Sequence, residues 1–313
     1  MKAVHLLSTF CVCATATTCP ALKFSTDTTS TNGWNSWSAS CSLGTDFTVP
    51  LGKKVWLKKN PAMSGELVID RGATSSNPGR HFWVKGELTV HDITFKGGYC
   101  TSHPGGGVLY ASGSAATVTL KNCVLSGNHG DPHAGAVFIR YSAKGTFEDC
   151  TFSDNTAKNF GGAIHLSDFA SAIFSRCSLI KNTAAAHGGA AITQSAASVV
   201  FESCTLNDNS AGMWGGAVYI DNNDKGGCKG TFIGSTLNGN KATSAGGAIY
   251  NLATTLIESC EINGNSAGLG GAIQSAGGTV TIADSVYKLN TLTKTSGSGE
   301  SFPPLFVSLS IYI

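Results

Sequence analysis

The chain has 313 residues, a net charge of +2 and only 13% charged side chains, and it contains 39 glycines but 8 prolines. No cluster of Lys and Arg is present, so neither nucleic acid nor an anionic membrane surface is favoured as a partner. Low charge together with many small residues is typical of a solenoid of short strands and tight turns.

Residues 1–16 resemble a secretory signal peptide. Lys2 precedes an uncharged stretch from Leu6 to Ala16, which ends in Ala-Thr-Ala, a sequence of the kind that signal peptidases cleave. No stretch of the chain approaches the roughly 18–20 apolar residues of a membrane-spanning helix. The sequence therefore predicts a secreted or surface-exposed protein without a transmembrane helix.

Residues 24–98 are predicted to form an N-terminal cap and the irregular first turns of the solenoid. The segment 24–46 is rich in Ser, Thr and Asn, as expected of a unit that covers the open end of a repeat structure. The residues that follow contain short apolar segments, for example at 53–58, 65–70 and 80–86. We expect these segments to be early strands with irregular spacing.

Residues 99–290 repeat a pair of small residues followed by a short apolar segment. The pair occurs seven times, and successive copies lie 24–31 residues apart. A fixed period in this range indicates one supersecondary unit stacked on copies of itself. The second residues of the pairs are Gly107, Gly135, Gly162, Gly189, Gly216, Gly247 and Gly271.

A second phrase lies upstream of each glycine pair, as in DCTFSDN at 149–155. It places Cys or Ser between two apolar columns and ends in Asn, which we expect in a left-handed bend. Apolar and polar residues alternate on both sides of a two-residue break, which indicates two strands. The glycine pair begins a third strand after a loop. The sequence therefore predicts an all-β, right-handed parallel β-helix of about eight regular rungs, with an irregular tail at 291–313.

The chain contains 11 cysteines, of which Cys11, Cys13 and Cys19 lie in or beside the signal peptide. Five others recur at one position of the phrase, where Cys is expected to be a small buried filler with poor disulfide geometry between rungs. Three more fall outside this column, and two of them could pair in an exported protein. The column contains Cys123, Cys150, Cys177, Cys204 and Cys260, and the outliers are Cys41, Cys100 and Cys228.

An apolar-x-x-Asn phrase followed by GGA[IV] resembles the repeats of chlamydial polymorphic outer-membrane proteins. FSDN…GGAI at 152–164 matches this pattern in full, and three further copies match it with Leu or Ile in place of Phe. The resemblance implies a β-helix displayed at the cell surface or outer membrane, with an adhesive role and with glycans or cell-surface proteins as partners. Similar repeats also look like those of β-helix proteins grouped with pectate lyases, so a polysaccharide lyase or hydrolase is the alternative.

Acidic side chains do not occupy neighbouring rungs at one register position. Glu148, Glu202 and Glu258 fall on alternate rungs, and Asp154 and Asp208 are likewise separated. Lyases and hydrolases need their acidic and basic groups close together. The sequence therefore favours a protein without catalytic residues, cofactor or bound metal, although loop geometry could still assemble a site.

The loop ahead of each glycine pair carries the strongest candidate for a binding site. Two residues before the second glycine, consecutive rungs place His133, Phe160, His187 and Trp214 along one edge. The two histidines are two rungs apart, which argues against a metal site. A row of such rings on a rigid scaffold is typical of a contact surface for a sugar or a protein. The alternative is that the rings merely cover the bend.

Overall fold

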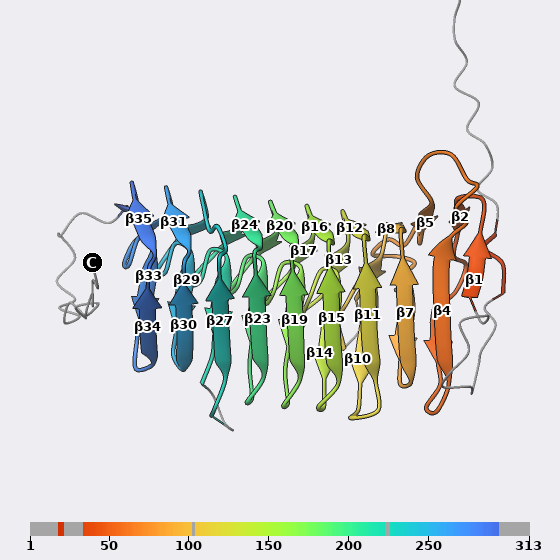
Figure 1. Ribbon diagram of the computed structural model, residues 1–313, viewed down its shortest axis with the longest axis horizontal. Coiled ribbons are helices and arrows are strands. Elements are labelled where there is room, and N and C mark those ends of the chain that lie inside the picture. The colour runs from red at the N-terminus through yellow and green to blue at the C-terminus, as the bar shows by residue number, and fades with distance from the viewer. Residues whose placement is uncertain (1–17, 22–33, 102–103, 223–225, 294–313) are drawn as a thin grey trace, which may run out of the picture.

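The computed structural model describes residues 18–21, 34–101, 104–222 and 226–293. Its strands stand side by side in one long row, with each turn of the chain stacked on the preceding turn (Figure 1). Among the described residues, all pairings between strands are parallel and no helix is present. The predicted signal peptide at 1–16 and the tail beyond residue 293 lie outside the described residues. The right-handed parallel β-helix is confirmed.

The longest strands form a ten-stranded sheet, here called the long-strand sheet. Its strands alternate between buried and more exposed positions, as in β11 and β23, because one face packs into the core and the other faces solvent. In spatial order they are β1 (Trp34–Trp37), β4 (Lys54–Lys59), β7 (Glu87–His91), β11 (Thr117–Lys121), β15 (Lys144–Glu148), β19 (Ser171–Ser175), β23 (Ser198–Glu202), β27 (Lys229–Ile233), β30 (Thr254–Glu258) and β34 (Thr279–Ala283).

The segments that follow the seven glycine pairs, together with two earlier strands, form the nine-stranded glycine-pair sheet. Its central strands are buried on both faces, as the pattern of β18, β22 and β26 shows. A continuous apolar segment suits a strand that is covered from both sides. The strands are β3 (Phe47–Val49), β6 (Phe82–Val84), β10 (Leu109–Ser112), β14 (Val137–Arg140), β18 (Ile164–Leu166), β22 (Ala191–Thr193), β26 (Val218–Ile220), β29 (Ile249–Asn251) and β33 (Ile273–Ser275).

The second half of the Cys phrase forms the phrase sheet. It has seven continuous strands and then a separate pair, and Thr236 bridges the two parts through Thr205 and Glu261. The strands are β2 (Cys41–Ser42), β5 (Val68–Asp70), β8 (Thr94–Lys96), β12 (Val124–Ser126), β16 (Thr151–Ser153), β20 (Ser178–Ile180) and β24 (Thr205–Asn207), followed by β31 (Glu261–Asn263) and β35 (Val286–Lys288).

A fourth sheet, the short sheet, consists of two-residue strands, and all but the first of them lie directly after the repeated Asn. The expectation of three strands and a loop in each rung is therefore wrong in this place. Two residues are too few to show an alternation, so the sequence pattern does not reveal this ladder. The strands are β9 (Tyr99–Cys100), β13 (His129–Gly130), β17 (Thr156–Ala157), β21 (Thr183–Ala184), β25 (Ser210–Ala211), β28 (Lys241–Ala242), β32 (Ser266–Ala267) and β36 (Thr291–Leu292).

In the core between the sheets, the first of the two predicted apolar columns consists of phenylalanines in four consecutive rungs. Phe147, Phe174, Phe201 and Phe232 are fully buried and stack on one another. Their adjacent ring centroids lie 4.5, 5.1 and 5.3 Å apart with interplanar angles of at most 22°. One long-strand residue per rung thus supplies the same ring to the core, which holds the rungs in register.

The repeated Asn does not occupy the left-handed bend that its residue type suggests. The residue before it does, since Asp154 and Lys181 have φ of 55° and 56°. The asparagines themselves are buried in a ladder: Asn182 Oδ1 accepts hydrogen bonds from the backbone N–H and the side-chain amide of Asn155. Its own amide donates to Phe152 O and to Asn209 Oδ1. The ladder satisfies backbone groups that the bend would otherwise leave without partners.

The three outlying cysteines, whose pairing the sequence left open, form no disulfide with one another. Cys41 is bonded to Cys19, with Cα atoms 4.9 Å apart, whereas Cys100 and Cys228 are buried thiols. The reason is backbone placement, because Cys19 N donates to Ser42 O and so lies beside β2. The repeat register contains no information on this segment, which precedes the regular rungs.

The cysteine column of the repeats consists of buried thiols, as predicted. Each Sγ donates to backbone carbonyls, for example that of Cys177 to Phe147 O at 3.4 Å. The neighbouring thiol and burial raise the pKa of Cys150, so its reactive thiolate form is suppressed. The column therefore acts as a filler between rungs.

We expect Cys150 and Cys177 to resist alkylation in the native protein and to react fully after denaturation. Burial keeps iodoacetamide from reaching the sulfur atoms, and the raised thiol pKa lowers the fraction of the reactive thiolate. Iodoacetamide labelling with peptide mass mapping measures the extent of reaction. Rapid labelling under native conditions, or a disulfide between these two residues, would contradict the buried column.

Candidate functional site

The glycine pairs determine where the loop edge of the solenoid lies. Gly161 and Gly188 have φ of 66° and 67°, a conformation that glycine adopts without steric cost. A Cβ atom on Gly162 would lie 2.0 Å from the carbonyl oxygen of Gly189, so no larger residue fits. Each rung therefore repeats the same turn, and the residues ahead of it stack in register.

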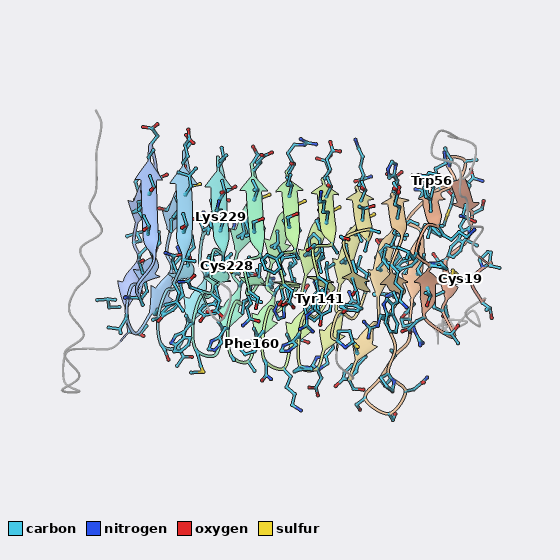
Figure 2. The ribbon with its side chains drawn as sticks, turned by 90° about the horizontal axis from the view of Figure 1, so that it is seen from below. Cys19, Trp56, Tyr141, Phe160, Cys228 and Lys229 are labelled. Carbon is cyan, nitrogen blue, oxygen red and sulfur yellow. A yellow bond between two sulfur atoms is a disulfide. The ribbon has the colours of Figure 1, made fainter. Side chains whose placement is uncertain are left out.

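His133, Phe160, His187 and Trp214 form one continuous stack on this edge, which we call the imidazole–aromatic column. Parallel β-bridges join their backbones. Neighbouring ring centroids lie 5.2, 5.2 and 4.5 Å apart, with interplanar angles of 7°, 13° and 7°. In Figure 2, Phe160 lies towards the lower edge of the solenoid, away from Lys229 on the long-strand sheet. The structure thus brings all four predicted residues together.

The rings of the column cover each other's faces. Trp214 continues the stack onto Tyr250, with centroids 5.2 Å apart. All four column side chains are half-buried, so their edges, rather than their faces, meet the solvent. Burial lowers the pKa of His187, and its ring is therefore neutral at pH 7. The column presents a straight edge of rings.

A second layer of rings lies beneath the column, on the outer face of the glycine-pair sheet. Phe138 and His165 are buried and stack with centroids 4.5 Å apart. Tyr219 is also buried, and its ring lies 5.1 Å from that of His187. Sequence alternation alone does not decide which way this position faces. The column is therefore the outer layer of an aromatic cluster outside the main core.

A polar row at the ends of the glycine-pair strands supports this cluster. His165 Nε2 lies 2.8 Å from Gln194 Oε1, and the Gln194 amide donates to Asp221 Oδ2. Tyr219 donates its hydroxyl hydrogen to Asp221 Oδ1, and burial together with that carboxylate raises the pKa of the phenol. This row is not among the residues predicted from the sequence, although Gln194 and Asp221 each lie five residues after a repeat glycine. That constant offset is the signal that could have found it.

The neighbouring acidic residues Glu148 and Asp149 are held in surface ion pairs. Arg176 pairs with both Glu148 and Asp149, and Lys121 pairs with Glu148. Hydrogen bonds from Lys121 and Arg176 hold the pKa of Glu148 below its ordinary value, and Arg176 does the same for Asp149. A general acid needs a raised pKa, so this arrangement is poorly suited to that role.

Two family models match the chain. The model of a right handed beta helix region matches residues 85–225, and the Chlamydia polymorphic membrane protein repeat matches residues 234–252. The chain is a right-handed β-helix repeat protein similar to the chlamydial polymorphic membrane proteins. No curated protein and no solved structure matches it. The β-helix match spans all four rungs of the imidazole–aromatic column.

Two further properties of this β-helix repeat protein bear on its chemistry. Within the described ranges, no three His, Cys, Asp or Glu side chains gather as ligands of a metal ion. In the same part of the chain, no helix has the length and apolar character needed to cross a membrane. The imidazole–aromatic column thus remains the candidate site to which the repeat register points.

Proposed function

We propose that this chain is a secreted or surface-exposed, adhesin-like binding module that contacts a protein on a cell surface through the imidazole–aromatic column. The similarity of its repeats to those of polymorphic membrane proteins supports surface display. The rigid stack of parallel sheets supports a role in presentation, because repeat solenoids expose long, preorganised surfaces.

The column itself is the observation that carries this proposal. His133, Phe160, His187 and Trp214 offer half-buried rings on four consecutive rungs, a span of about 14 Å at the spacing of parallel strands. Their backbones are held by β-bridges, so little conformational entropy is lost when a partner binds. Protein interfaces are enriched in such aromatic residues.

The ring geometry favours a protein over a glycan at the column. A sugar that packs on an aromatic residue uses an open ring face, but here each inner face lies against the next ring. Ring edges and imidazole nitrogen atoms instead suit contact with side chains and backbone groups of a protein. The experiment below distinguishes a protein partner from a glycan partner at this column.

A cell-binding assay tests the proposal with His133, Phe160, His187 and Trp214 replaced together by Ala. We expect binding of labelled protein to host-type cells to fall at least tenfold, because the contact surface is removed. Protease treatment of the cells should remove binding by the wild type, and glycosidase treatment should leave it. A single Phe160→Lys variant repeats the test with one change, in case the fourfold variant folds poorly.

The matched control replaces four outward-facing residues, exposed or half-buried, on consecutive rungs of the long-strand sheet, and circular dichroism checks that each variant is folded. Unchanged binding by the fourfold column variant would refute the proposed site. Turnover of acidic polysaccharides by the wild type would refute the binding-module class and favour a lyase or hydrolase. The control positions are Thr146, Ile173, Val200 and Thr231.

A further inference from the structure

Trp83 on β6 is exposed at a register position that is buried in the following rungs. It pairs with Tyr110, which pairs with Phe138, and all three lie in one column of the glycine-pair sheet. Trp83 is 36% exposed, whereas Tyr110 and Phe138 are 5% and 1% exposed. The covering stack of rings begins only at His133, so it does not extend over Trp83.

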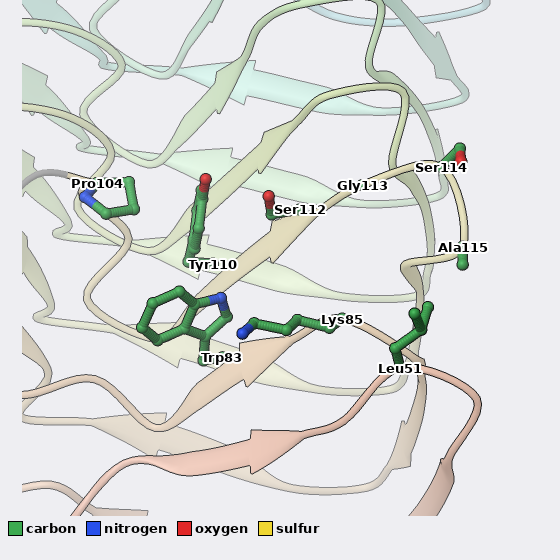
Figure 3. A pocket seen from close by; sticks show the side chains of 9 residues that line it. All are labelled: Leu51, Trp83, Lys85, Pro104, Tyr110, Ser112, Gly113, Ser114 and Ala115. Carbon is green, nitrogen blue, oxygen red and sulfur yellow. The ribbon is translucent and has the colours of Figure 1, made fainter.

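An open pocket of about 390 Å³ lies against Trp83. This volume is within the range of about 300–1,000 Å³ that small-ligand sites have. Figure 3 shows Trp83 of β6 and Lys85, which follows that strand directly, beside Tyr110 and Ser112 of β10, with the turn at 113–115 as a wall. The pocket therefore combines an exposed indole, a cation and hydroxyl groups.

Lys85 gives this pocket a positive charge. Its Nζ atom lies 4.8 Å from the centroid of the Trp83 ring, in a cation–π contact. The carboxylate of Asp46 pairs with Arg71 and Arg80. Among the residues that the structure describes, Lys85 takes part in no ion pair. The ammonium group is thus available to an anionic ligand.

We propose that this pocket binds an acidic saccharide, with the sugar ring packed on Trp83 and its carboxylate or sulfate paired with Lys85. The apolar face of a pyranose ring suits an exposed indole, and the hydroxyls of Ser112 and Ser114 suit those of a sugar. The ion pair with Lys85 adds a charge-assisted hydrogen bond that a neutral sugar lacks. This site goes beyond the proposed function, because it lies on other rungs and takes a different class of ligand.

Calorimetric and NMR titrations of the full chain test the site with 3′-sialyllactose, a sulfated heparin disaccharide and lactose. We expect both acidic sugars to bind at least tenfold more tightly than lactose, with affinity that falls as salt screens the ion pair. Sialyllactose presents a carboxylate alone, whereas the heparin disaccharide adds sulfate groups to the carboxylate of its uronic acid, so tighter binding of the disaccharide would show a contribution of sulfate. Equal binding of lactose, or no binding of either acidic sugar, would overturn the proposal.

Two variants separate the parts of the pocket. Lys85→Gln should remove the preference for acidic over neutral sugar, whereas Trp83→Ala should weaken binding of every sugar about tenfold. The matched controls are Lys229→Gln and Trp56→Ala, which alter the same residue types on the long-strand sheet (Figure 2). Sugar binding that survives both pocket variants would place the site elsewhere. Loss of cell binding in the column variants leaves these titrations unaffected, so the two proposals fail independently.

Discussion

Replacing Phe174 by Ala is expected to lower the free energy of unfolding by about 3–5 kcal/mol, as for other buried phenylalanines. The ring is fully buried and lies between those of Phe147 and Phe201, at 4.5 and 5.1 Å. It also meets Phe152 edge to face at 5.7 Å. Its loss leaves a cavity in the middle of the stack. The rungs cannot move together to fill this cavity, because parallel hydrogen-bond ladders fix their spacing on both sides. Urea unfolding followed by circular dichroism measures the effect.

The matched control is Ile173→Thr on the same strand. Ile173 points to the outer face and is 45% exposed, and Thr already occupies this register position one rung earlier, at Thr146. We expect this variant to change the free energy of unfolding by less than about 1 kcal/mol. Equal effects of Phe174→Ala and Ile173→Thr would contradict the assignment of the two faces.

Replacing Asn182 by Ala is expected to destabilise the fold by about 3 kcal/mol or more. Four hydrogen bonds disappear, two that Asn182 accepts from Asn155 and two that it donates to Phe152 O and Asn209 Oδ1. The orphaned groups are buried, and each costs about 1–3 kcal/mol when no partner replaces the lost one. The same urea titration measures the change.

Asn159→Ala is the control for the ladder, because Asn159 has an exposed side chain on the loop edge. We expect this variant to unfold at nearly the same urea concentration as the wild type. A loss of less than about 1 kcal/mol in Asn182→Ala would show that water can replace the ladder, and that the repeated Asn is not a main source of stability.

Much of the fold could be predicted from the sequence, because the repeat makes every rung a copy of one unit. The period of the glycine pairs indicates stacking, and the alternation around Cys150 and Cys177 indicates which residues face the core. Phe174 and Phe201 could be assigned to one buried column for the same reason. In a stacked structure, residues with the same offset must lie one above the other, whatever the local detail.

The same logic predicts the membership of the imidazole–aromatic column but not its geometry. The offset from each glycine pair places Phe160, His187 and Trp214 in one row. Whether the rings offer faces or edges depends on side-chain torsions, which the neighbours above and below select. The exposure of Trp83 is likewise invisible in the repeat, because the covering column of rings begins only at His133.

By itself, the sequence determined the period, the core-facing columns and the row of rings on the loop edge, because these follow from constant spacing. Only the tertiary structure decided the short fourth sheet, the buried Asn ladder and the bond between Cys19 and Cys41. Each of these depends on contacts between residues that are far apart in the chain, or on segments too short to show a period. From residue type alone, the repeated Asn was assigned to a bend. In the stacked structure its side-chain amide instead forms buried hydrogen bonds with the neighbouring rungs.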